Sequence, residues 1–133
     1  MVLGKDGAAW PLLKRVFSFC LGGRLGGGKQ WVPWIHLDDE VGIILHAIEN
    51  ANISGPVNLT APNPVTNAEL TTAIARTVKR PAICHAPAFA LKLVLGGLGS
   101  VVLDSQRAQP QAALDAGYDF KYRELGDALR ALV

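Results

Sequence analysis

The chain has 133 residues, of which 50% are hydrophobic and 18% are charged, so it predicts a folded domain and excludes a disordered segment. Its formal net charge is only +2, and lysines and arginines occur singly or in short pairs, so no nucleic-acid partner is expected. Cys20 and Cys84 form no Cys-x-x-Cys pair, which argues against a zinc site and fits a reducing compartment. No secretory signal is visible, and the longest apolar run, residues 86–98, is too short to cross a bilayer. We therefore expect a cytoplasmic chain with no membrane partner, and leave an organellar location open.

The first part of the chain predicts an extended segment, a helix and a second extended segment. Residues 1–4 have the pattern of the end of a strand, so we expect the chain to be the second half of a larger fold. Apolar residues at helical spacing predict a helix from about residue 8 to residue 21, ended by the glycines at 22 and 23. Residues 31–37 predict a strand that Pro33 makes irregular at its start.

A second helix is predicted over residues 40–50. Asp38 and Asp39 precede it, and aspartate is a preferred N-cap residue because its carboxylate accepts hydrogen bonds from free N–H groups of the first turn. Apolar residues at the spacing i, i+3, i+4 and i+7 predict one buried stripe, formed by Val41, Ile44, Leu45 and Ile48.

The middle of the chain contains the clearest helix start. A short strand is predicted at residues 57–60, followed by a stiff loop with two prolines. Thr66 and Glu69 then have the Thr-x-x-Glu spacing of a capping box, in which each side chain accepts the backbone N–H of the other residue. These features predict a helix that runs to about Lys79.

The last third of the chain predicts further strands and helices in alternation. Residues 83–86 predict a short strand, and residues 87–97 an apolar helix between a proline and two glycines. A short helix is predicted over residues 110–117. Aromatic residues alternate with polar ones over residues 118–122, which predicts a strand with one aromatic face, and residues 125–132 have the pattern of a terminal amphipathic helix.

Strands that alternate with helices indicate an α/β fold with some parallel pairing. The sequence predicts about five helices but only a few short strands, too few for a self-sufficient parallel sheet, because such a sheet needs helices on both faces. We therefore expect residues 1–133 to form a single lobe of a larger α/β protein.

Residues 22–28 contain five glycines, and glycine allows the backbone to lie close to a ligand. Residues 23–29 also match Gly-x-x-x-x-Gly-Lys, the pattern of a phosphate-binding loop. However, Gln30 follows where that loop needs the Ser or Thr that holds Mg²⁺, and a helix precedes the loop where a strand is required. The pattern therefore disfavours a nucleotide triphosphatase, and leaves either a ligand-facing loop or a plain connection.

Several blocks of the sequence together resemble one family. The most specific are Trp-Ile-His-Leu-Asp-Asp at residues 34–39 and Asn-Leu-Thr-Ala-Pro at residues 58–62, and Leu-Gly-Lys-Asp-Gly at residues 3–7 and the glycine loop continue the match. With these blocks the chain resembles the carboxyl-terminal half of the NAD-dependent epimerase family, a group of atypical extended short-chain dehydrogenases/reductases. The resemblance implies the C-terminal lobe of an extended Rossmann-type fold.

The resemblance also implies a protein of two halves. An N-terminal Rossmann half binds NAD(P) and carries a Tyr-x-x-x-Lys pair whose tyrosine is the general acid/base, and the C-terminal half closes the substrate cleft. This sequence has no glycine fingerprint after a strand, and no lysine stands four residues after Tyr118 or Tyr122. We therefore expect no catalytic residue and no NAD(P) binding in this chain alone, and leave open whether it is part of an enzyme.

The candidate residues for the substrate or cofactor cleft come from the glycine loop, the segment that follows it and one later arginine. They are Gly26, Gly28, Gln30, Trp31, Trp34, His36 and Arg107. Each has a structural alternative: a histidine bound to backbone, tryptophans that bury area in the core, and a solvated or salt-bridged arginine. We expect Asp39 to cap a helix, and no metal site.

Two functions are compatible with these features. The first is the substrate-binding lobe of an NAD(P)-dependent epimerase or reductase-like protein, inactive without its dinucleotide-binding half, with a small molecule as substrate. The second is a truncated isoform or fragment that acts as a non-catalytic interaction module. In either case the expected partner is the missing Rossmann half or a second copy, which an exposed sheet edge would attract.

Overall fold

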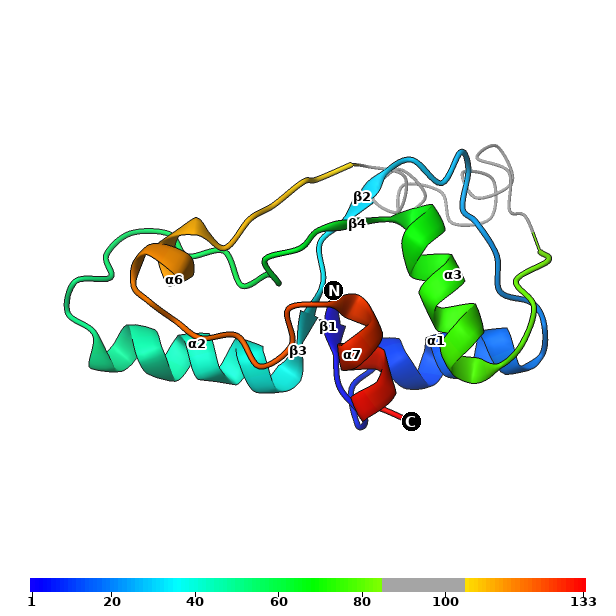
Figure 1. The fold of residues 1–133 in the computed structure, drawn as a ribbon, viewed down its shortest axis with the longest axis horizontal. Coiled ribbons are helices and arrows are strands. Elements are labelled where there is room, and N and C mark those ends of the chain that lie inside the picture. The colour runs from blue at the N-terminus through cyan, green and yellow to red at the C-terminus, as the bar shows by residue number, and fades with distance from the viewer. Residues whose placement is uncertain (85–104) are drawn as a thin grey trace.

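The computed structural model describes residues 1–84 and 105–133 (Figure 1). In chain order, the elements within these residues are β1 (Val2–Leu3), α1 (Ala9–Ser18), β2 (Trp31–Val32), β3 (Ile35–His36), α2 (Leu37–Glu49), β4 (Val65–Thr66), α3 (Asn67–Val78), α6 (Gln111–Asp115) and α7 (Leu125–Ala131). The described part is thus α/β with short strands, as predicted. The helix predicted over residues 87–97 lies outside the described residues. None of the described helices is long and apolar enough to span a membrane.

The strands form two pairs at the centre of the molecule (Figure 1). β1 and β3 are parallel, with Val2 opposite Ile35 and Leu3 opposite His36, while β2 and β4 are antiparallel. The end of a strand predicted at residues 1–4 is therefore confirmed. The strand predicted over residues 31–37 is divided in two, and the break includes Pro33, which has no N–H to give to a ladder.

Helix α1 ends earlier than predicted, and a non-glycine residue closes it. Cys20 adopts the left-handed conformation with φ of 57°. Its N–H donates to the carbonyl oxygen of Phe17 at 2.9 Å, and the N–H of Leu21 donates to that of Val16 at 3.1 Å. This pair of bonds is a Schellman motif, which satisfies the last free carbonyls of a helix. The glycines at 22 and 23 therefore do not end the helix, although the sequence predicted that they would.

Two hydrophobic cores lie on opposite sides of the β1–β3 pair. The larger one joins α1, α3 and α7 and contains Leu3, Trp10, Phe17, Trp34, Ala61, Leu70, Ile74, Leu125, Ala128, Leu129 and Leu132. The smaller one lies beside α2 and contains Ile35, Ile43, Ala113 and Phe120. The indole N–H of Trp10 donates to the carbonyl oxygen of Leu132 at 3.2 Å, which ties the first helix to the last. Figure 1 shows this division, with α2 and α6 on one side and α1 and α3 on the other.

The capping box at the start of α3 is formed as predicted. The Thr66 side chain accepts the N–H of Glu69, and the Glu69 carboxylate accepts the N–H of Thr66 at 2.7 Å. The backbone N–H of Thr66, and its hydroxyl at 2.8 Å, both donate to the Glu69 carboxylate and hold the pKa of Glu69 below its ordinary value of 4.5, because the charged carboxylate is the better acceptor. The helix ends at Val78, and Lys79 closes it in the left-handed conformation.

Helix α2 differs from the prediction in its start and in its buried face. It begins at Leu37, and its buried residues are Asp39 and Ile43. The stripe predicted to be buried is exposed instead, with exposed fractions of 46% for Val41, 44% for Ile44, 54% for Leu45 and 75% for Ile48. The physical reason is that the described residues pack against only one side of a helix that is apolar on two sides.

The strands predicted at residues 57–60 and 118–122 are not formed. Residues 85–86 of the strand predicted at 83–86 lie outside the described residues, and residues 83–84 are not in a strand. Burial still alternates over residues 118–122, where Phe120 is buried and its neighbours are exposed. Backbone N–H groups of this segment bond to a carboxylate of α2, so no neighbouring strand is needed to satisfy them.

Gly42 on α2 has no side chain, and the Tyr118 ring packs where a side chain would lie. A Cβ atom at residue 42 would lie 2.0 Å from the Tyr118 hydroxyl oxygen, too close for any real contact. We predict that Gly42→Ala lowers the free energy of unfolding by about 1–3 kcal/mol through overpacking, although alanine favours a helix by about 1 kcal/mol over glycine. Chemical unfolding followed by circular dichroism measures this change.

The control for this prediction is the same substitution in a Tyr118→Phe background. Phenylalanine lacks the atom that the new Cβ would strike first, so Gly42→Ala should cost less stability there. An equal cost in both backgrounds would show that the close approach of Tyr118 is not what requires glycine.

Candidate functional site

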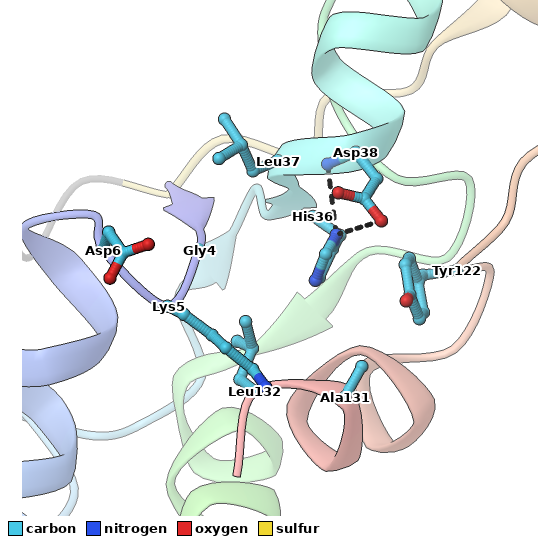
Figure 2. Close-up of a pocket in the computed structure, with 9 residues that line it drawn as sticks. All are labelled: Gly4, Lys5, Asp6, His36, Leu37, Asp38, Tyr122, Ala131 and Leu132. Carbon is cyan, nitrogen blue, oxygen red and sulfur yellow. Dashed lines mark hydrogen bonds and ion pairs between the residues drawn. The ribbon is translucent and has the colours of Figure 1, made fainter.

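The candidate site lies at the carboxyl ends of the parallel strands. In open α/β sheets, ligands bind just beyond these ends, where loops and helix N-termini converge. A pocket of about 280 Å³ lies there (Figure 2). Its lining residues come from the segment after β1, the start of α2 and the C-terminal segment: Gly4, Lys5, Asp6, His36, Leu37, Asp38, Tyr122, Ala131 and Leu132. We refer to it as the His36 pocket.

His36 has two roles at this pocket because it ends β3 and is also the N-cap of α2. Its Nδ1 accepts the backbone N–H of Asp38 at 3.1 Å, so the proton of the neutral ring is on Nε2. Nε2 is buried and has no hydrogen-bond partner among the described residues. The ring lies beside that of Tyr122 (Figure 2), with 4.0 Å between the ring centroids and 37° between the ring planes. The site thus contains a buried donor without an acceptor.

Burial keeps the His36 ring neutral. The side chain is almost fully enclosed, and this desolvation lowers the pKa of His36 below its ordinary value of 6.5. The nearby carboxylates of Asp38 and Asp39 oppose the shift, and the ammonium of Lys121 adds to it. At neutral pH the ring is therefore a hydrogen-bond donor through Nε2 and carries no charge.

Asp39 holds the C-terminal segment against the start of α2. Its buried carboxylate accepts the N–H groups of Lys121 and Tyr122, both at 2.8 Å, and the hydroxyl of Tyr118 at 3.2 Å. Burial and the negative charge of Asp39 raise the pKa of Tyr118 to about 12. The predicted role of Asp39 as a helix cap is wrong, since His36 takes that position. Asp39 instead positions Tyr122 against the His36 ring.

The rim of the pocket carries an ion pair. The Lys121 ammonium lies 2.6 Å from the Asp38 carboxylate, and both side chains are largely exposed. This hydrogen bond holds the pKa of Asp38 below its ordinary value and that of Lys121 above its own. On the opposite side, Figure 2 shows the Lys5 side chain extending toward Leu132. The pocket therefore combines a neutral donor with charged groups of both signs at its edge.

The glycine loop packs on α3 and does not line the His36 pocket. Gly26 and Gly28 are both buried, with φ of 57° and 70°. The carbonyl oxygens of Gly28 and Gln30 accept the first two N–H groups of α3, each at 2.9 Å. The Gln30 side chain donates to the carbonyl oxygen of Leu25 at 2.9 Å. These contacts satisfy the free N–H groups of a helix start, which is a structural role.

The remaining candidates also lie outside the pocket. Trp34 is only 1% exposed and belongs to the larger core, and its indole N–H donates to the carbonyl oxygen of Asn63 at 3.0 Å. The Arg107 guanidinium lies over the Trp31 ring, 4.8 Å from its centroid, which is a cation–π contact. Of the seven cleft candidates, only His36 lines the His36 pocket.

Several pocket residues were not among the candidates. Lys5 and Asp6 follow directly after the first strand, so the expectation that ligand sites lie beyond strand ends could have identified them. Tyr122 lies far from His36 in sequence, and its N–H group bonds to Asp39, three residues after His36, a contact that no short motif predicts. No group of three histidine, cysteine, aspartate or glutamate side chains in the described part of the chain could hold a metal ion.

The comparisons with known proteins agree on one family. A family model described as a domain of unknown function, DUF1731, matches residues 86–132. The chain is 43% identical over 133 residues to the chloroplastic epimerase family protein SDR39U1 homolog of Arabidopsis thaliana, and 41% identical to the epimerase family protein YfhF of Bacillus subtilis. It superimposes on the crystal structure of human epimerase family protein SDR39U1 (isoform 2) with NADPH with a TM-score of 0.92, at 35% identity over 98% of this chain.

The chain is similar, over its whole length, to the carboxyl-terminal part of epimerase family proteins. It matches only a carboxyl-terminal part of its relatives, spanning 38% of the Arabidopsis protein, 44% of the Bacillus protein and 45% of the human chain. A second solved structure, the nucleoside-diphosphate sugar epimerase of Corynebacterium glutamicum, has a TM-score of 0.74 at 37% identity, and the chain covers 24% of it. The predicted resemblance and the C-terminal lobe of an epimerase fold are thus confirmed. The compartment stays a prediction.

Asp39 in this epimerase lobe offers a test of how the C-terminal segment is held. An amide at residue 39 would place an NH₂ group against at least one N–H or O–H donor. We predict that Asp39→Asn lowers the free energy of unfolding by about 1–3 kcal/mol, the usual cost of leaving a buried donor without an acceptor. The matched control is Asp38→Asn, which breaks the exposed pair with Lys121, leaves the contacts of Asp39 in place and should cost much less. Equal losses in urea unfolding would contradict the role given to Asp39.

His36 predicts a pH dependence of the stability of the lobe. Because its pKa is lowered in the folded chain, the unfolded chain binds more protons below pH 6.5, and stability falls as the pH decreases from there. His36→Asn keeps an acceptor that suits an N-cap and does not titrate. Between about pH 7 and about pH 5, the wild type should therefore lose stability relative to this variant, as urea unfolding would measure.

Other groups do not obscure this pH difference. The lowered pKa values of Asp38 and Glu69 stabilise the folded chain. That stabilisation is lost only as the pH falls below their ordinary values of 3.8 and 4.5. Burial lowers the pKa of the terminal amine of Met1, and that group is the same in both proteins. Parallel stability curves for wild type and His36→Asn would show that the ring is not held neutral.

Proposed function

We propose that this chain is the substrate-binding lobe of an NAD(P)-dependent epimerase or reductase-like protein, and that it is inactive without a dinucleotide-binding half. The observation that supports this proposal is the position of the His36 pocket, at the carboxyl ends of a parallel strand pair. The lobe supplies a histidine and a set of charged groups there. It supplies neither a Tyr-x-x-x-Lys pair nor a glycine fingerprint after a strand.

The proposed contact of His36 with a substrate rests on its unpartnered Nε2–H. A buried donor without an acceptor costs free energy, and a substrate oxygen would satisfy it. The neutral ring suits a carbonyl or hydroxyl oxygen, which needs no opposite charge. His36 would thereby orient a small polar substrate and would not itself transfer a proton.

The proposed cofactor is NAD(P), bound by the half that this chain does not contain. The human relative was crystallised with NADPH, and this chain spans 45% of that protein. We propose that the 133-residue chain alone binds no NAD(P). Nucleoside-diphosphate sugars are the first substrates to test, because a structural relative is described as an epimerase of that class.

A chimaera tests this division of roles. In it, the chain replaces the segment of the Arabidopsis relative that it matches, which leaves the rest of that protein as the dinucleotide-binding half. NADPH fluorescence titration should show binding to the chimaera and none to the isolated chain. Submicromolar binding to the isolated chain would contradict the proposal.

The same chimaera tests His36 by substitution. His36→Asn retains the N-cap acceptor and removes Nε2, so turnover or binding of a nucleoside-diphosphate sugar should fall about three- to tenfold, the value of one hydrogen bond. The melting temperature should change little. His46→Asn is the control, because His46 bonds to the carbonyl oxygen of Ala116, away from the pocket. Equal effects of the two variants on turnover would argue against substrate contact by His36.

A second function, a non-catalytic interaction module, is supported by the exposed apolar side of α2. Failure of the chimaera to bind NADPH, with the isolated chain folded, would favour this function over the first.

A further inference from the structure

A hollow lies between α1, the glycine loop and α3, and it shares no lining residue with the His36 pocket. Its volume is about 140 Å³, and most of its lining is apolar, with Leu13, Phe17, Leu21, Leu70 and Ile74 among the residues. Leu21 is also 63% exposed, so the hollow opens at the surface. We call it the α1–α3 hollow. The function proposed above makes no use of it.

The polar side chains of the α1–α3 hollow already have partners. The side-chain oxygen of Asn67 accepts the N–H of Leu25 at 2.9 Å, and the Thr71 hydroxyl donates to the carbonyl oxygen of Gly23 at 3.4 Å. The hollow therefore suits an apolar group. Because an apolar cavity of about 150 Å³ can hold benzene, the α1–α3 hollow has the size for one aliphatic or aromatic side chain.

Large apolar side chains are exposed at the same end of the molecule. The N–H of Cys84 donates to the carbonyl oxygen of Gly22 at 3.3 Å, so the chain after α3 runs beside the loop after α1. This contact places Ile83 at the same end as Leu21 and Phe19, and the exposed fractions of Ile83 and Phe19 are 76% and 69%. Figure 1 shows the C-terminal ends of α1 and α3, two helices that pack together, at this end. Exposed apolar patches of this kind mark interaction surfaces.

The elements around the α1–α3 hollow come from stretches of the chain without any acidic residue. No aspartate or glutamate occurs within residues 7–37 or 70–84, which include α1, the glycine loop and most of α3. Both stretches contain exposed basic residues, which are Lys14, Arg15, Arg24, Lys29, Arg76, Lys79 and Arg80. None of these seven makes an ion pair with any residue at 1–84 or 105–133. The described part of the chain therefore leaves the positive charge of this end without a neutralising carboxylate.

We infer that this end of the molecule binds an acidic peptide segment of another protein. One apolar side chain of the peptide would fill the α1–α3 hollow, and the carboxylates of the peptide would lie beside the basic residues. An apolar anchor in a pocket supplies much of the affinity of such a contact, and complementary charge directs the association. This binding does not require a dinucleotide-binding half.

Other anionic partners fit these features less well. A nucleic acid would use the basic residues but would leave the hollow and the exposed apolar side chains without a partner. An anionic bilayer would contact Phe19 and Ile83, but the hollow is too small for a lipid acyl chain. A peptide with acidic and apolar residues uses the hollow, the exposed apolar side chains and the positive charge together.

Labelled synthetic peptides test the anchor. Each peptide carries glutamates on both sides of one central leucine, isoleucine or phenylalanine, and fluorescence anisotropy follows its binding to the 133-residue chain. At least one of these peptides should bind saturably, and binding should weaken as the ionic strength rises, because salt screens exposed charges. Alanine in place of the central residue should weaken binding by about tenfold or more. If no peptide binds, or if the alanine peptide binds equally well, the inference fails.

A charge variant tests the position of the site. Arg24→Gln with Arg80→Gln should weaken peptide binding about three- to tenfold and leave the melting temperature unchanged, since both side chains are exposed and make no described ion pair. The matched control is Arg123→Gln with Arg130→Gln, which removes the same charge from the C-terminal segment. The control should bind the peptide as the wild type does. Equal weakening by the two variants would show attraction to the overall net charge and would overturn the inference.

Three further results would assign these side chains to another occupant and overturn the inference. Sedimentation with phosphatidylglycerol vesicles, without binding of any peptide, would indicate a membrane surface. A dimer of the chain that Phe19→Ser with Ile83→Ser dissociates would indicate a second copy. A lower melting temperature of that variant, measured without peptide, would show that the chain itself covers these side chains.

Discussion

The carboxylate of Asp39 is the interaction on which the candidate site depends. It accepts two backbone N–H groups and one phenol hydroxyl from a segment about eighty residues further along the chain. Without it, the backbone N–H groups of Lys121 and Tyr122 would lose their acceptor. A carboxylate in the first turn of a helix is also favoured by the helix dipole, which offsets part of the cost of burying its charge. One side chain thus ties the first turn of α2 to the C-terminal segment and sets the position of Tyr122.

The sequence predicted the elements that depend on local chemistry. The capping box of Thr66 and Glu69, the irregularity at Pro33 and the end of a strand near the start of the chain are present as predicted. The single strand predicted over residues 31–37 is two strands in the structure. The α/β class and the family resemblance were also correct. Local patterns failed where a long-range partner decides the structure. Asp39 has the composition of an N-cap but bonds to residues that no short motif connects with it.

The candidate site was predicted only in part. His36 was identified because it belongs to the specific sequence block of residues 34–39 and ends a strand, whereas the glycine loop was a candidate through its composition alone. In the structure that loop presents carbonyl oxygens to the first turn of α3, a task that requires unusual backbone angles and no ligand. The stripe on α2 shows the opposite error. Its periodicity correctly indicates a face that prefers burial, but periodicity does not say whether the same chain provides the cover.

The larger core has a consequence for how the lobe forms during synthesis. Four of its buried residues, Leu125, Ala128, Leu129 and Leu132, belong to the final segment of the chain, and they pack with Leu3 and Trp10 from its beginning. A polypeptide emerges from the ribosome with its N-terminus first, so α1 and α3 must wait for α7 before their apolar sides are enclosed. Until α7 has been synthesised, the nascent lobe leaves this apolar surface exposed.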